Sequence, residues 1–240
     1  MRIASAALVP SVALAVAGCG DASPQPKVRS ASFRFVSVVG GFGGCAGRGA
    51  YDFGRRLGGL SLDCSKLVGG HLRFLEIGDE VYLGAGRLAG QKRWIVSHVR
   101  GGPQSIIGAI GGFDPFYGRG PAEMLEYLRS HGSGVSRVGS DKVRGTQTTQ
   151  YRGTLSGPRD EHVTVSLWAD SAGTVRRIRT RYPSGAPLTV TVDLLRFDVP
   201  VTTVAPPRST VMTSAEYQAY ARKQLKRDTG GLLHLYGPSR

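Results

Sequence analysis

Short segments in which apolar and polar residues alternate follow one another from residue 29 onward, with glycine-rich stretches between them. Successive side chains of a β-strand point to opposite faces, so this period of two predicts strands that each have one buried face. The first run of predicted strands covers residues 29–39, 48–53, 60–66, 71–77, 80–83 and 92–97. The second run covers residues 134–143, 146–155, 161–169, 174–182 and 188–197. The short turns between them favour a meandering antiparallel sheet.

Two helices are predicted between these two runs of strands. Ile106, Ile107 and Ile110 lie close together and predict a short helix, which an aromatic loop follows. Residues 121–130 predict a firmer helix, because Met124, Leu125 and Leu128 form an apolar stripe at helical spacing. A third helix, basic at its end, is predicted at residues 214–227.

The alternation also assigns the faces of the predicted sheet. Val163, Val165 and Leu167 fall on one side of their strand, and the residues between them are polar. An apolar sheet face must be covered by another element, and the two middle helices are the candidates. We therefore predict an α+β fold, in which a single curved antiparallel sheet carries helices over its concave face.

The amino terminus has the layout of an export signal. Residues 3–18 are small and apolar behind Arg2, and the run is too short to span a bilayer, which needs about 20 such residues. It ends in Val-Ala-Gly-Cys at residues 16–19, which resembles the lipobox of bacterial lipoproteins. We predict that residues 1–18 are a signal peptide, that lipid is attached to Cys19, and that residues 19–28 form a flexible tether. The alternative is an ordinary signal peptide with an incidental cysteine.

Cys45 and Cys64 are the other two cysteines. An exported chain folds in an oxidising compartment, where cysteines tend to pair. A hairpin that pairs Tyr51 with Leu60 across a turn at residues 54–59 would place the two cysteines nearly opposite each other. The sequence predicts a disulfide, with two buried free thiols as the alternative.

The chain is strongly basic, with a formal net charge of +14 at pH 7. Such a charge suits nucleic acid, an anionic membrane surface or acidic polymers, but an exported chain does not ordinarily meet nucleic acid. We expect the membrane surface to be the partner. Arg177, Arg179 and Arg181 alternate along one predicted strand, so a binding patch and a merely solvated sheet face both remain open.

Catalytic signals are weak in this sequence. The five histidines are scattered, and none begins a metal-binding or nucleophile motif. The residues therefore predict no enzyme, no metal site and no cofactor.

Several phrases resemble a known family when they are taken in order behind the lipobox. They are the helix after Pro121 and the segments 135–145, 149–154, 167–170, 173–178 and 190–193. Together they resemble actinobacterial lipoproteins of the LppX/LprG type, which are related in fold to the LolA/LolB lipoprotein carriers. The resemblance implies a half-open barrel of about eleven antiparallel strands over residues 29–208, with helices on its concave side around an apolar, lipid-binding cavity. The cysteine pair and the basic helix and tail at residues 209–240 depart from that pattern.

The first functional hypothesis is an extracytoplasmic, membrane-anchored monomer that binds or carries a lipid or another acylated ligand. The residues expected to line its cavity are apolar positions of the predicted strands and helices: Phe33, Phe35, Leu72, Phe74, Trp94, Ile106, Ile110, Met124, Leu125, Leu128, Tyr151, Val165, Leu167, Ile178, Val190 and Val192. For each of them the alternative is plain core packing. The second hypothesis is a non-catalytic envelope interaction or signal-modulating protein, with a packed core and a basic binding surface.

Overall fold

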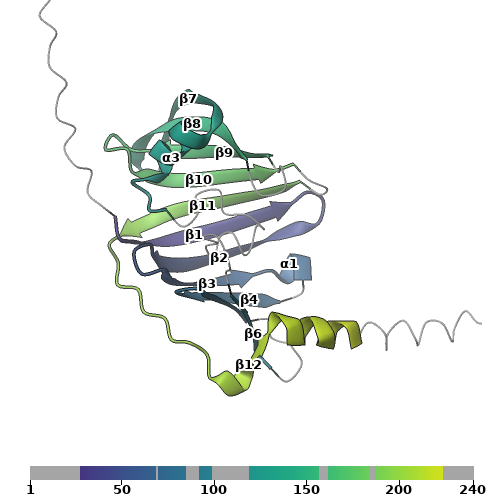
Figure 1. Ribbon diagram of the computed structural model, residues 1–240. Helices are drawn as coiled ribbons and strands as arrows, with labels where there is room; N and C mark the ends of the chain where they lie inside the picture. The colour runs from purple at the N-terminus through teal and green to yellow at the C-terminus, as the bar shows by residue number, and fades with distance from the viewer. Residues whose placement is uncertain are drawn as a thin grey trace, which may run out of the picture.

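The computed structural model describes residues 28–68, 70–84, 92–98, 119–156, 162–183 and 187–223, which form one large, curved and unclosed sheet (Figure 1). The strand order is β12-β6-β5-β4-β3-β2-β1-β11-β10-β9-β8-β7. The strands are β1 (Ser30–Val39), β2 (Gly43–Asp52), β3 (Leu57–Asp63), β4 (His71–Ile77), β5 (Glu80–Gly84), β6 (Trp94–His98), β7 (Ser133–Val143), β8 (Thr146–Ser156), β9 (His162–Ala169), β10 (Val175–Tyr182), β11 (Leu188–Phe197) and β12 (Val211–Thr213). Neighbouring strands are antiparallel, except that β12 runs parallel to β6.

The predicted α+β fold is confirmed as a single curved, mostly antiparallel sheet. Each strand predicted by alternation occurs, and β4 and β11 have the predicted bounds. The sheet has 12 strands instead of about eleven, because β12 adds a short parallel edge strand from the segment that the sequence placed in the basic extension.

The glycine-rich stretch that begins at residue 40 belongs largely to β2. Gly47 and Gly49 face the apolar side of the sheet, opposite Phe35 and Phe33 on β1. A Cβ at Gly47 would clash with the backbone carbonyl of Ser61 and also meet Cδ2 of Leu62 at 2.8 Å, so a larger residue has no space there. These glycines let the aromatic rings of β1 lie over the backbone of β2.

Helix α3 (Met124–His131) corresponds to the helix predicted at residues 121–130. Its Leu128 is fully buried against β8, where Gly153 allows a close approach: a Cβ on that glycine would lie 3.3 Å from Cδ1 of Leu128. Met124 and Leu125 are also buried and join the same apolar core. The helix therefore covers one end of the apolar face.

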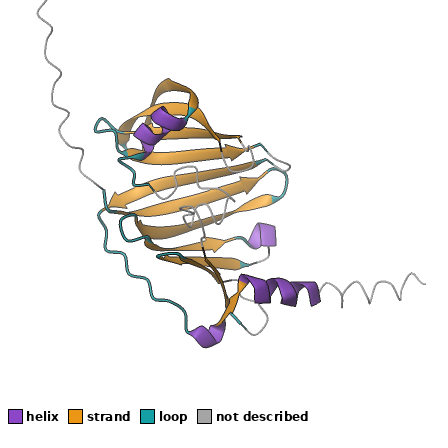
Figure 2. Cartoon of the chain, viewed as in Figure 1, coloured by secondary structure: helices purple, strands orange, loops and turns teal. Residues whose placement is uncertain are grey.

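The expectation that helices cover the whole concave face is not confirmed. Figure 2 shows α3 at the end of the sheet that carries β7, β8 and β9, and the short helix α1 (Ser65–Val68) lies against β2. The helix predicted around Ile106 and Ile110 lies outside the described residues.

A disulfide joins Cys45 on β2 to Cys64, the residue after β3, with the two Cα atoms 4.3 Å apart. The predicted pairing is confirmed, but the predicted register is wrong. Tyr51 pairs with Gly58 and not with Leu60, because the turn is shorter than expected and β3 already begins at Leu57. The observed register continues from Ala46 opposite Asp63, which brings the two cysteines directly across from each other.

The chain after β11 runs in extended form to a 3-10 turn, η3 (Arg208–Thr210), and then to β12 (Figure 1). Residues 214–223 are helical, within the predicted range of 214–227. The backbone N–H of Thr213 donates to Oε2 of Glu216 at 2.6 Å, and the N–H of Glu216 donates to Oγ1 of Thr213 at 3.2 Å. This reciprocal pair is a capping box, which satisfies two free backbone donors at the start of the helix.

Candidate functional site

The apolar face of the sheet is the site that the sequence predicted, and its side chains form continuous rows across the strands. One row passes from β4 to β8 through directly opposite residues: Leu72, Leu62, Gly47, Phe35, Val192, Ile178, Leu167 and Tyr151. Phe35 and Leu167 have no exposed surface. Because directly opposite side chains contact each other in a sheet, this row is a continuous hydrophobic band.

The rows on either side extend the same surface. Phe74, Leu60, Phe33 and Leu194 lie in the row toward one end of the strands, with Gly49 between Leu60 and Phe33. Val165 and Val190 lie in the row toward the other end, on either side of Thr180. The result is a broad apolar face interrupted by few polar groups.

Most of the predicted lining residues belong to this face. Those buried in the core cluster are Phe33, Phe35, Phe74, Met124, Leu125, Leu128, Val165, Leu167, Ile178, Val190 and Val192. Leu72 and Tyr151 are partly buried and pack against the cluster. Ile106, Ile110 and Cys19 lie outside the described residues.

Trp94 is the exception, because it lies on the opposite face of the sheet. Its partner across the ladder is Gly84, which in turn pairs with Arg73. A Cβ on Gly84 would lie 2.9 Å from the indole ring, so the ring covers that glycine. The guanidinium carbon of Arg73 is 5.6 Å from the ring centroid. Trp94 therefore packs among polar-face residues.

Sequence reasoning missed several members of the apolar face. Leu60, Leu62 and Leu194 are nearly inaccessible and stand between predicted residues in the rows. The alternation Leu-Ser-Leu at residues 60–62 was the available signal.

The carboxylate of Glu76 also lies on this face, and it was not predicted from the sequence. Glu76 on β4 has no exposed surface. The Tyr51 hydroxyl donates to its Oε1 at 2.8 Å, and Nη2 of Arg56 approaches the same oxygen at 3.4 Å. These groups compensate a buried negative charge, which would otherwise be costly.

A pocket of about 600 Å³ opens beside the apolar core, at the end of the sheet where β1 begins. It is lined by Val28, Arg29, Asp52, Phe53, Gly54, Arg55, Gly120 and Glu123. Phe53 packs against the core cluster, and its ring makes an edge-on contact with Tyr51 at 5.2 Å. The pocket therefore combines an apolar inner wall with a charged rim, and its volume lies within the range of about 300–1,000 Å³ typical of ligand sites.

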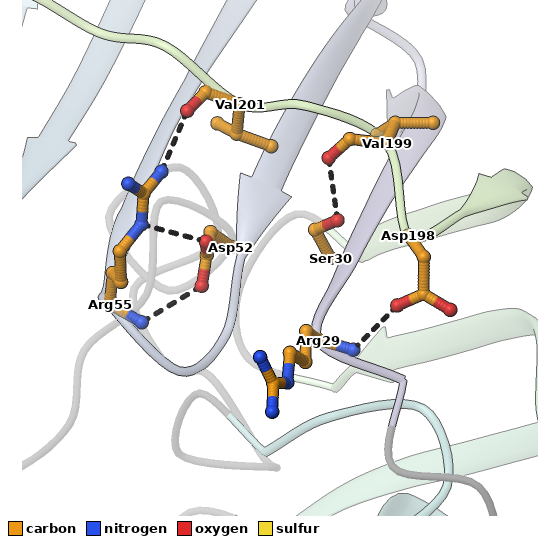
Figure 3. A network of polar contacts seen from close by, with 7 residues as sticks. All are labelled: Arg29, Ser30, Asp52, Arg55, Asp198, Val199 and Val201. Carbon is orange, nitrogen blue, oxygen red and sulfur yellow. Dashed lines mark hydrogen bonds and ion pairs between the residues drawn. The ribbon is translucent and has the colours of Figure 1, made fainter.

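Polar contacts hold this rim in place (Figure 3). Nε of Arg55 donates to Oδ2 of Asp52 at 2.8 Å, and Nη2 donates to the Val201 carbonyl at the same distance. The backbone N–H of Arg29 donates to Oδ1 of Asp198 at 3.0 Å, while its guanidinium points away from that carboxylate. The turn after β2 and the start of β1 are thus tied to the chain that leaves β11.

The opposite face of the sheet is polar and rich in arginine. Arg177 on β10 forms an ion pair with Asp193 on β11, with Nη2 of the guanidinium 3.2 Å from Oδ2. The hydrogen bond to Asp193 raises the pKa of the Arg177 guanidinium, and the negative charges of Asp193 and Asp141 add to the effect. This arginine is fixed as a cation on that face.

Two further observations concern other classes of site. Within the described ranges, no group of three or more histidine, cysteine, aspartate or glutamate side chains is arranged to hold a metal ion. No helix in the same part of the chain is long and apolar enough to cross a membrane.

No known protein-family model matches this chain, and no curated protein matches it in sequence. Similar solved structures include the lipoprotein LppX of Mycobacterium tuberculosis, which is 13% identical with a TM-score of 0.46, over 74% of this chain and 90% of LppX. LprF of Mycobacterium bovis is 15% identical with a TM-score of 0.39, over 73% of this chain and 89% of LprF.

A LolA superfamily protein of Nitrosomonas europaea is 8% identical with a TM-score of 0.30, over 76% of this chain and 89% of that protein. LppX, LprF and a LolA superfamily protein, which are of the types that the sequence resembles, are thus among the similar structures.

Proposed function

We propose that this protein is a lipoprotein of the cell envelope that binds acyl chains on the apolar face of its sheet. The observation that carries the proposal is the continuous hydrophobic row from Leu72 on β4 to Tyr151 on β8. Among the described elements, α3 covers only the β8 end of that face. An acyl chain along the row would gain about 0.8 kcal/mol for each methylene that leaves water.

The pocket of about 600 Å³ where β1 begins suits a ligand that has an apolar tail and a polar group. Phe53 packs against the core and Val28 adds a second apolar wall, while the opening carries charged side chains of both signs, Arg29 and Arg55 beside Asp52 and Glu123. An amphipathic ligand would place its tail along the apolar face and its polar group at this rim. The sequence adds the lipobox, since lipid on Cys19 would keep the domain at the surface of a membrane.

Ligand content tests this function directly. The full chain, expressed in its native envelope, is purified and extracted with organic solvent, and the extract is analysed by mass spectrometry for acyl lipids. We expect lipid at close to one molecule per protein. Repeatedly empty extracts would contradict the proposal.

A pair of matched variants connects the ligand to the apolar face. Leu72→Trp adds bulk to a partly exposed position of the row, and Val138→Trp adds the same ring to an exposed position of β7. Lipid content is expected to fall in Leu72→Trp and to remain in Val138→Trp. Equal content in both variants, with both folded by circular dichroism, would mean that the ligand lies elsewhere.

The anchor has its own experiment. Cys19→Ser removes the thiol that accepts lipid, so the protein is expected to move from the membrane fraction to the soluble extracytoplasmic fraction. If the intact mass of the parent protein shows no added acyl groups, the predicted anchor is wrong. The binding face is tested separately, by extracting lipid from both the parent protein and Cys19→Ser.

A second candidate is an envelope interaction protein with a filled core. The observation that favours it is that Phe35, Val165 and Leu167 have no exposed surface at all. Empty extracts, together with retained association with an envelope partner, would support this function over lipid binding.

A further inference from the structure

A small pocket of about 120 Å³ opens on the polar face of the sheet, where β8, β9 and β10 lie next to one another. It is lined by Arg152, Thr164, Ser166, Arg179 and Arg181. Guanidinium and hydroxyl groups therefore supply its walls, and no carboxylate is among the lining side chains. This composition is that of a site for an anion.

The strand register explains how these side chains converge. Ser166 on β9 stands between Arg152 on β8 and Arg179 on β10, each directly opposite it. Thr164 lies two residues before Ser166 on β9, and Arg181 on β10 lies directly opposite it. Opposite Cβ atoms in such pairs are about 5 Å apart. The register thus places cationic side chains on both sides of Ser166, a residue that is 7% exposed.

The positive charge of this pocket is not balanced by the described residues. Arg177, which lies two residues before Arg179 on β10, forms an ion pair with Asp193 on β11. Arg179 and Arg181 have Thr191 and Thr189 at the corresponding positions of β11. Across the described part of the chain, no carboxylate forms an ion pair with Arg152, Arg179 or Arg181. Like charges on adjacent strands repel, so a bound anion would relieve a local cost.

An aromatic residue supports one wall of the pocket. The guanidinium carbon of Arg179 lies 5.3 Å from the ring centroid of Trp168, which is 4% exposed. Arg177 contacts the same ring at 5.7 Å. A guanidinium held against a rigid ring loses less conformational freedom when it binds a ligand. The arginine is therefore partly preorganised for binding.

We propose that this pocket binds a phosphate group. The planar guanidinium of arginine matches two phosphate oxygens with parallel hydrogen bonds, and the hydroxyls of Thr164 and Ser166 can donate to the remaining oxygens. The volume suits a single tetrahedral group. Such a group can come from the headgroup of an anionic lipid or from a free phosphate compound, and the chemistry of recognition is the same for both.

Binding of inorganic phosphate is measured by titration calorimetry at constant ionic strength, with chloride as the balancing anion. The full chain with Cys19→Ser is compared with the same chain carrying Arg179→Gln or Arg181→Gln. Each loses a charged hydrogen bond, so affinity is expected to fall by about tenfold or more. Arg196→Gln removes the same charge from an exposed position of β11 outside the pocket and is expected to change affinity less than about twofold.

Vesicles distinguish the two sources. Cosedimentation uses phosphatidylcholine vesicles with and without phosphatidylglycerol. A headgroup site predicts binding only to the anionic vesicles, lost in Arg181→Gln and kept in Arg196→Gln. A free-phosphate site predicts pocket-dependent binding of inorganic phosphate without vesicle binding. If no ligand binds, or if the pocket and control variants lose binding equally, the proposal is overturned.

The pocket lies on the face opposite the proposed acyl-binding surface, because Arg179 and Arg181 alternate with the buried residues Ile178, Thr180 and Tyr182 along β10. Failure of the phosphate experiments would therefore leave the lipid extraction result unchanged, and the reverse also holds.

Discussion

Phe33 on β1 lies directly opposite Gly49 on β2, and a methyl group on that glycine would be 2.6 Å from Cζ of the phenylalanine ring. The absence of a side chain at residue 49 is thus what allows the ring to approach the backbone of the neighbouring strand. The same ring belongs to the row next to the one from Leu72 to Tyr151, on the apolar face that we propose as the lipid-binding surface. The glycines of β2 therefore make room for the aromatic side chains of β1.

This relationship predicts the effect of Gly49→Ala. The added methyl would also meet the backbone carbonyl of Gly59, which cannot move easily, so overpacking should destabilise the fold by about 1–3 kcal/mol. Urea denaturation followed by circular dichroism measures the change. Gly139→Ala is the control, because a Cβ there meets no atom within 4 Å. An equal loss in both variants would contradict this account.

Removal of the disulfide is expected to weaken the protein substantially. Cys45 and Cys64 are 19 residues apart in sequence, and replacing both by alanine frees a loop of that size in the unfolded chain. The expected loss in the free energy of unfolding is about 3 kcal/mol. Denaturation with and without dithiothreitol checks it: reductant should lower the midpoint of the parent protein and leave the variant unchanged. A parent protein insensitive to reductant would count against the bond.

Tyr82 should titrate later than an ordinary tyrosine. Burial raises the pKa of its phenol to about 12, and the hydrogen bond to Glu80 at 2.5 Å adds to the effect. The folded pKa lies above the unfolded value near 10, so this group stabilises the fold fully below pH 10 and loses that contribution as the pH rises toward 12. Absorbance at 295 nm measures tyrosinate, and Tyr82→Phe should remove one component that titrates near pH 12. An unchanged titration curve in that variant would refute the prediction.

The stability of the helix at residues 214–223 should fall at acid pH, because protonation of Glu216 weakens its capping box. The hydrogen bond from the Thr213 backbone lowers the pKa of Glu216 below its ordinary value of 4.5. A depressed folded pKa means that the stabilisation is complete above pH 4.5 and disappears as the pH falls through the folded value.

Nuclear magnetic resonance shifts of residues 214–223 between pH 6 and pH 2 measure this change. Glu216→Gln, which cannot titrate, should flatten the curve. A transition that persists unchanged in that variant would assign the acid sensitivity to another group.

Alternation along the sequence located most strands because one face of the sheet is apolar, although β7 is exposed at nearly every position. It failed where that signal is absent. Residues 211–213 are too few to show a period, and their partner β6 is distant in sequence, so β12 was missed. Trp94, Ile95 and Val96 are consecutive apolar residues, and only the register with β5, which sets Trp94 opposite Gly84 and Ile95 opposite Leu83, fixes which side faces the core.

The candidate site divides in the same way. The apolar rows were foreseeable from single strands, whereas their continuity depends on the register between strands. The phosphate pocket shows this most clearly, because Arg179 and Arg181 are visible as a pattern but nothing local indicates that Arg152 stands across from Ser166. The hairpin register also escaped prediction, since glycines at residues 54, 58 and 59 allow more than one turn.

The central position of β1 constrains the order in which the protein can assemble. Its residues pair with β2 immediately after it and with β11, which ends at Phe197. In a chain that emerges with its amino terminus first, β1 to β6 can pair early, but the other edge of β1 stays without a neighbour until β11 has emerged. Pairing between strands so far apart in sequence slows folding, and it leaves an unpaired strand edge that is prone to aggregation. We expect this protein to depend on a chaperone during biogenesis more than a sheet built only from sequential hairpins would.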